Sequence, residues 1–110
     1  MAFRVDITEA ALADAEEFVE YVRNLKSAKR DVVGAERRWN GLLDALFSLE
    51  RQPGRGSLVA EAALRTRGLR QILYKSQRVV FDLDEQREVV RILRIYHGTR
   101  RELRPRDVRR

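Results

Sequence analysis

Cysteine is absent from the 110-residue chain, and histidine occurs only once, at His97. Disulfide bonds and thiolate metal sites are therefore excluded, and a metal site built from histidines is not expected. We accordingly expect neither a metal ion nor a cofactor. Lysine is scarce as well, with three residues, so arginine carries almost all of the positive charge.

Long apolar runs are also missing. None approaches the roughly 18 residues that a membrane span requires, and residues 1–7 lack the apolar segment of a signal peptide. We therefore expect a cytoplasmic protein with no membrane partner. A chain of 110 residues fits one domain with a single modest core. We place this domain at residues 1–103 and expect the basic residues 104–110 to form a flexible tail.

The net charge of +6 is distributed unevenly. Residues 1–50 contain seven Lys/Arg and ten Asp/Glu, whereas residues 51–110 contain 16 Lys/Arg and seven Asp/Glu. A general preference for arginine would explain the scarcity of lysine but not this placement. The second half is therefore predicted to present a basic face to a polyanion or to an acidic partner peptide, while the first half serves as a scaffold.

The first half is predicted to form one strand and two helices. Residues 3–7 alternate between apolar and polar side chains, which indicates a half-buried strand. Thr8 is a favourable helix N-cap, and apolar residues recur at helical spacing over residues 9–25, which predicts the first helix. A second helix, which Asp31 could cap, is expected to end at Pro53. The two helices should form an antiparallel hairpin.

The second half is predicted to form three strands. A loop is expected at residues 52–57, and residues 58–66 are irregular or form a short turn of helix. Strands follow at 68–74, 78–84 and 88–97, and their short connections predict an antiparallel meander. The first strand should pair at an edge of the sheet or beside the last strand. The chain is therefore expected to be α+β, with both helices on one face of a single sheet and arginines lining the other, partly open face.

This order of elements and several motifs resemble the RelE/ParE superfamily of bacterial toxins from type II toxin–antitoxin modules, which includes plasmid stabilisation proteins. The strand-to-helix start at residues 8–14 and the second helix with its proline ending at 39–53 are similar to those of the family. The last strand closes with Ile-Tyr-His-Gly-Thr-Arg at 95–100. The resemblance, which spans about residues 3–103, implies a small toxin that blocks growth until a cognate antitoxin binds it. The two proteins could form a hetero-oligomer.

The superfamily divides by target. RelE-like members enter the ribosomal A site and cut messenger RNA, whereas ParE-like members poison DNA gyrase and are not known as nucleases. This sequence lacks the C-terminal tyrosine that many RelE-like members stack on a base, and it lacks their lysines before the meander. The resemblance therefore favours ParE-like action on gyrase, with a RelE-like endoribonuclease as the alternative. A non-toxic basic nucleic-acid-binding domain and a degenerate toxin that only dimerises also stay open.

The RelE-like alternative would place a catalytic site on three residues. RNA cleavage without a metal needs a base for the 2′-hydroxyl proton, a cation on the scissile phosphate and an acid for the leaving 5′-oxygen. Arg78 and His97 fall where RNase members of the family carry an arginine and a histidine, and Glu61 lies where some place a carboxylate base. His97 could instead be structural, because it ends a strand before a glycine.

Contacts with the target or the antitoxin are predicted for a further set of side chains. Guanidinium groups match phosphate oxygens in a bidentate way, so exposed arginines on the open face are natural contact residues. Arg91 and Arg94 have opposite parity, so a regular strand would place at most one of them on that face. The predicted contact residues are Arg70, Arg78, Arg94, Tyr96 and Arg100.

Overall fold

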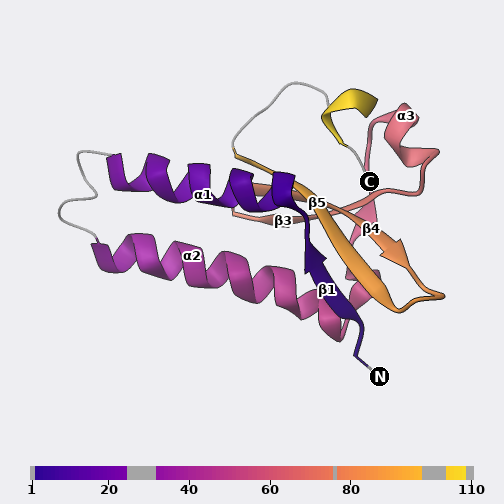
Figure 1. The fold of residues 1–110 in the computed structure, drawn as a ribbon, viewed down its shortest axis with the longest axis horizontal. Coiled ribbons are helices and arrows are strands. Elements are labelled where there is room, and N and C mark those ends of the chain that lie inside the picture. The colour runs from indigo at the N-terminus through magenta and orange to yellow at the C-terminus, as the bar shows by residue number, and fades with distance from the viewer. Residues whose placement is uncertain (1, 25–31, 76, 98–103, 109–110) are drawn as a thin grey trace.

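The computed structural model describes residues 2–24, 32–75, 77–97 and 104–108. It contains a five-stranded sheet of order β1-β5-β4-β3-β2, with two long helices on one face (Figure 1). The strands are β1 (Arg4–Ile7), β2 (Ser57–Leu58), β3 (Arg70–Tyr74), β4 (Gln77–Asp84) and β5 (Val89–His97). The helices are α1 (Glu9–Asn24), α2 (Val32–Phe47) and the short α3 (Ala62–Arg65). In the described part of the chain, no helix is both long and apolar enough to cross a membrane.

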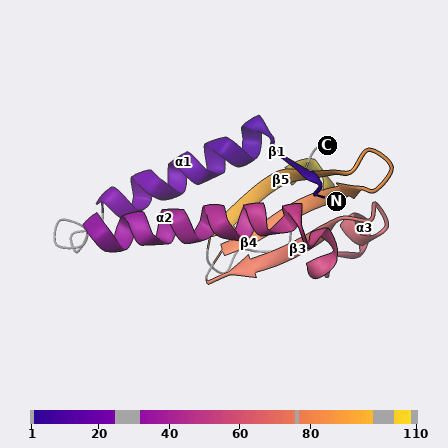
Figure 2. The same ribbon diagram turned by 90° about the horizontal axis from the view of Figure 1, so that it is seen from below.

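The predicted α+β fold is confirmed, with an N-terminal strand, two long helices and a three-stranded meander. β1 runs parallel to β5 and lies at the sheet edge, beside the last strand as expected, whereas the other pairs are antiparallel. The predicted N-cap is also present, because Thr8 Oγ1 accepts a hydrogen bond from Ala11 N at 3.2 Å. The same hydroxyl donates to Ile92 O at 2.8 Å, so the cap joins the start of α1 to β5. Figure 2 shows α1 and α2 side by side, projecting past the end of the sheet.

Two elements differ from the sequence-based expectations, and a third confirms one of two expected options. α2 ends at Phe47 rather than at Pro53, because residues 48–50 tighten into a 3₁₀ turn in which Ser48 Oγ donates to Ala45 O at 2.6 Å. β2 lies in the region predicted as loop; two residues are too few to give a periodic pattern. α3 is the short turn of helix that was one of two options for its segment. The predicted cap at Asp31 lies outside the described residues.

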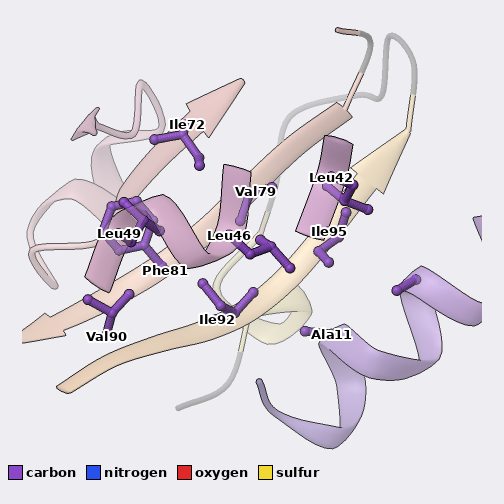
Figure 3. Close-up of a cluster of buried hydrophobic side chains, with 11 residues drawn as sticks. Ala11, Leu42, Leu46, Leu49, Ile72, Val79, Phe81, Val90, Ile92 and Ile95 are labelled. Atoms are coloured by element: carbon purple, nitrogen blue, oxygen red, sulfur yellow. The ribbon is translucent and has the colours of Figure 1, made fainter. Parts of the chain in front are cut away.

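The main core lies between α1, α2 and the sheet (Figure 3). Leu42, Leu46 and Leu49 recur along one side of α2 and its 3₁₀ extension, and all three are buried. The small Ala11 and Ala15 allow the α1 backbone to approach β5 closely. The sheet side of this core consists of Ile72, Val79, Phe81, Val90, Ile92 and Ile95.

A second hydrophobic cluster lies on the opposite face of the sheet. Its buried residues are Val59, Leu64, Leu69, Val80, Leu93, Tyr96 and Val108. The expectation of a partly open face lined by arginines is therefore wrong here, because α3 and the C-terminal segment cover it. The described part of the predicted tail, residues 104–108, packs on the sheet, and Val108 is fully buried. One valine among arginines gives no periodic signal from which this packing could be predicted.

A β-bulge in β5 decides which side chains reach this second face. Val80 pairs with Arg94 and Phe81 with Ile92, so Leu93 is an extra residue without a partner on β4. Arg91 pairs with Asp82, which lies on the same side of β4 as Val80. Arg91 and Arg94 therefore share one face. The prediction that at most one of them could do so assumed a regular strand.

We expect Val108→Ala to lower the free energy of unfolding by about 2 kcal/mol, because it removes two buried methyl groups and leaves a cavity. Denaturation in urea, followed by circular dichroism, would measure the change. Arg106→Ala, an exposed position in the same segment, should change stability by less than about 0.5 kcal/mol. Equal effects of the two substitutions would show that the segment is not packed on the sheet.

Candidate functional site

Arg78 and Glu61, two of the predicted site residues, lie in direct contact. Arg78 is on β4, on the face that carries the second cluster, and Glu61 immediately precedes α3. Both terminal nitrogens of the guanidinium donate to the Glu61 carboxylate, at 2.8 and 2.5 Å, and Nε donates to Gln71 Oε1. The side chains of Arg78 and Glu61 are 21% and 8% exposed. The fold therefore holds them as a bidentate, largely buried ion pair.

Arg94 forms a second network, which joins three distant parts of the chain. Its guanidinium donates to the two Asp14 carboxylate oxygens on α1, at 2.7 and 2.9 Å, and to Asp107 O in the C-terminal segment, at 2.8 Å. It also lies over the Tyr96 ring, 4.9 Å from the ring centre. The hydrogen bond with Asp14 raises the pKa of Arg94 above its ordinary value, although burial opposes the shift. This stabilisation is present below the ordinary arginine pKa and is lost only at still higher pH, so it does not vary near neutrality.

Asp14 has a further role at the edge of β5. One of its carboxylate oxygens accepts the backbone N–H of Ile95 at 2.9 Å. β1 pairs with β5 only as far as Ile92, so the carboxylate satisfies a strand N–H that β1 does not reach. The sequence analysis did not single out Asp14. The available signal was its place next to Ala15, a small residue of the kind that faces the core of a closely packed helix.

The remaining predicted residues are placed as follows. Tyr96 is buried, and its hydroxyl donates to Asp107 O at 3.2 Å, so its ring does not offer an open surface for stacking. Arg70 Nη1 donates to Gly56 O at 2.8 Å, which ties β3 to the loop before β2. His97 is the last residue of β5, but its side chain lies outside the described part of the chain, as does Arg100.

The predicted exposure of Arg78 and Arg94 was wrong, because each guanidinium is held by a carboxylate of the protein itself. An exposed arginine could be removed with little loss of stability. The two ion pairs reverse that expectation, since removing one partner leaves a partly buried charge. Among the described residues, no group of three or more His, Asp or Glu side chains is arranged to hold a metal ion.

Gln77 was not predicted as a special residue, yet its side chain is in an unusual environment. It begins β4 opposite His97 and is 3% exposed. Neither its amide nitrogen nor its amide oxygen bonds to a described residue. A buried amide of this kind costs about 1–3 kcal/mol when it lacks partners.

The amino-acid sequence of this chain matches a known protein family. A family model described as the ParE toxin of the type II toxin–antitoxin system parDE matches residues 5–102. The chain belongs to this family. The predicted membership of the RelE/ParE superfamily is thereby confirmed. No curated protein matches the ParE-family chain in sequence.

Solved structures share the fold. The chromosomal ParDE toxin–antitoxin system of P. aeruginosa matches with a TM-score of 0.68 and 16% identity, covering 89% of this chain and 98% of that one. The RelBE2 toxin–antitoxin complex of Mycobacterium tuberculosis matches with a TM-score of 0.63 and 20% identity, covering 88% and 99%. At these identities the likeness concerns the fold. Both branches of the superfamily are represented, so the fold does not distinguish their targets.

We expect Asp14→Ala to cost about 3 kcal/mol of stability, because it leaves a partly buried guanidinium and a strand N–H without their acceptor. A double-mutant cycle with Arg94→Met, measured by urea denaturation, should give a coupling of more than about 1 kcal/mol. Glu17→Ala, at an exposed position of the same helix, is the control and should have little effect. Additive effects of Asp14→Ala and Arg94→Met would show that the pair does not bind the helix to the strand.

Replacing the Gln77 amide by an apolar side chain should stabilise the protein, in contrast to the loss expected for Asp14→Ala. Gln77→Leu is expected to raise the free energy of unfolding by about 1 kcal/mol, because it removes a buried polar group that lacks described partners. Gln71→Leu is the matched control and should destabilise the protein, since it removes an acceptor of Arg78. Thermal or urea unfolding would measure both. A loss of stability in Gln77→Leu would mean that the amide is bonded in solution.

Proposed function

We propose that this member of the ParE toxin family arrests bacterial growth through ParE-like binding to DNA gyrase, without acting as a nuclease. The observation that carries the proposal is that both arginines predicted to hold a phosphate, Arg78 and Arg94, are bound to carboxylates within the fold. The match to the ParE family model over residues 5–102 supports the same branch.

The chemistry of RNA cleavage explains why these ion pairs matter. A metal-free nuclease stabilises the transition state with a cation that is already aimed at the scissile phosphate. Here the fork of the Arg78 guanidinium is occupied by Glu61 and its Nε by Gln71. A phosphate would have to displace Glu61, whose side chain is 8% exposed, and leave a buried carboxylate without its partner. Glu61 would also have to leave Arg78 before it could take a proton from a 2′-hydroxyl.

Binding to a protein target needs no acid–base pair, and the surface offers anchors for it. Four large apolar side chains among the described residues are substantially exposed: Leu12, Phe47, Leu58 and Leu73. Apolar anchors of this kind carry much of the binding energy in protein interfaces. The similar proteins of known structure include ParDE and RelBE toxin–antitoxin complexes. We therefore propose that a cognate antitoxin binds and neutralises the protein in a hetero-oligomer.

The RelE-like endoribonuclease remains the second candidate, because one observation favours it. Glu61 and Arg78 are in contact, and Arg78 follows Gln77, the residue that pairs with His97 on β5. The three predicted catalytic positions therefore come from the same end of the sheet. If the Glu61–Arg78 pair opened on the ribosome, a base and a phosphate-binding cation would become available together.

Inducing the protein in a bacterial host separates the two candidates. Gyrase poisoning should give DNA breaks and filamentous cells while translation continues at first, and His97→Ala should be only mildly less toxic because target binding is spread over a surface. An endoribonuclease should give messenger RNAs cut within codons in a few minutes. His97→Ala would then reduce cleavage by about 10²- to 10⁴-fold.

Arg38→Ala is a suitable control, since this exposed arginine lies on α2, which covers the face of the sheet opposite Arg78 and Glu61. Messenger cleavage that depends on His97 would replace the gyrase proposal with the RelE-like one. Normal growth with abundant soluble wild-type protein would contradict both candidates.

A further inference from the structure

Positive charge gathers where α3 meets the C-terminal segment, at three exposed arginines and the half-buried Arg67. Arg65 ends α3, Arg67 follows two residues later, and Arg104 and Arg106 flank Pro105 in the segment that ends the described chain. Arg67 Nη1 lies 3.5 Å from Pro105 O, to which it donates. Figure 1 shows α3 and the yellow C-terminal turn next to each other. We call the surface of these four arginines the basic corner.

Buried apolar packing beneath the four arginines holds the basic corner in place. Leu64 of α3 and Val108 of the C-terminal segment belong to one buried cluster, and neither is exposed to solvent. Asp107 O accepts hydrogen bonds from both Arg94 and Tyr96 on β5. Two segments about 40 residues apart in the sequence are therefore fixed side by side, with Arg67 in contact with the residue between Arg104 and Arg106.

Few negative charges offset this surface. The segments 57–69 and 104–108 contain only two carboxylates, Glu61 and Asp107. Glu61 is bound by Arg78, and the Asp107 carboxylate accepts the backbone N–H of Arg104 at 2.9 Å. The arginines of the sheet that were predicted to meet a polyanion are engaged within the fold. Among the described arginines of the second half, those of the corner therefore remain candidates for the basic face that the charge distribution predicts.

The chemistry of the corner favours one class of partner. In the segments 57–69 and 104–108, Leu58 of β2 is the one large exposed apolar side chain among the described residues, and none lies on α3 or on residues 104–108, so the corner is poor in the anchors of a protein interface. Tyr96, the aromatic residue of the cluster beneath the corner, is buried and does not provide the stacking platform that single-stranded nucleic acids use. Exposed guanidinium groups without either feature suit the phosphate backbone of a duplex.

We propose that the basic corner binds the phosphate backbone of duplex DNA without sequence preference. This contact does not require gyrase or any other protein target. It would hold the protein on DNA, and for a toxin that acts on a DNA-bound enzyme it would raise the local concentration near the target.

Fluorescence anisotropy of the full-length protein, made by cell-free synthesis, with a labelled 20-base-pair duplex of arbitrary sequence would test the proposal. The logarithm of the association constant should fall linearly with the logarithm of the salt concentration, with a slope of about −0.9 for each phosphate contact. The double variant Arg104→Gln/Arg106→Gln should bind more weakly and should reduce the steepness of that slope by about 2. Both side chains are exposed, so the fold should persist, which a melting curve would check.

The matched control is Arg37→Gln/Arg38→Gln, which removes the same charge from exposed positions on α2. It should leave the slope unchanged. The proposal would be overturned by an equal loss in this control, by an unchanged slope in the corner variant, by tighter binding to a single strand of the same length or by no binding at low salt. Since the assay contains no gyrase and no ribosome, its outcome is separate from that of the growth-arrest experiment.

Discussion

The ion pair between Arg94 and Asp14 connects the parts of this protein that the chain order keeps apart. Asp14 comes from the first helix, Arg94 from the last strand, and the same guanidinium holds the C-terminal segment through Asp107 O. Asp14 also receives the Ile95 N–H, so one carboxylate both closes the edge of β5 and orients the arginine. Without this interaction the first helix would lose its ion pair with the sheet and would keep its apolar packing and the Thr8 cap. The C-terminal segment would lose one of the two hydrogen bonds that Asp107 O accepts from side chains of β5.

The β-bulge at Leu93 determines how this pair can form. It shifts the remainder of β5 by one residue, so that Arg94 faces away from the main core while Ile92 and Ile95 both face into it. The same shift gives Leu93 to the second cluster. The sheet is therefore apolar on both faces over much of β4 and β5. This is why a short helix and a C-terminal turn suffice to cover the side opposite the long helices.

The arginines of this protein fall into two groups, those bound within the fold and those at the surface. The strand residues Arg70, Arg78 and Arg94 are bound by carbonyl or carboxylate groups of the protein and stabilise the fold. Those at the ends of α3 and in the C-terminal segment remain at the surface. A family toxin with this arrangement keeps its potential phosphate-binding groups engaged on the sheet and presents apolar anchors and a basic corner elsewhere. That distribution is the basis on which gyrase binding without nuclease action is proposed.

The sequence alone determined the α+β class, the strand-to-helix start with its cap at Thr8, the two long helices and the meander, because each depends on local periodicity and turn chemistry. It also placed Glu61 and Arg78 among the candidate residues. Only the tertiary structure decided that these two bind each other, that Asp14 holds Arg94 and that Val108 is buried. These features depend on pairing between residues far apart in the chain and on one extra residue in β5, and neither leaves a periodic pattern in the sequence.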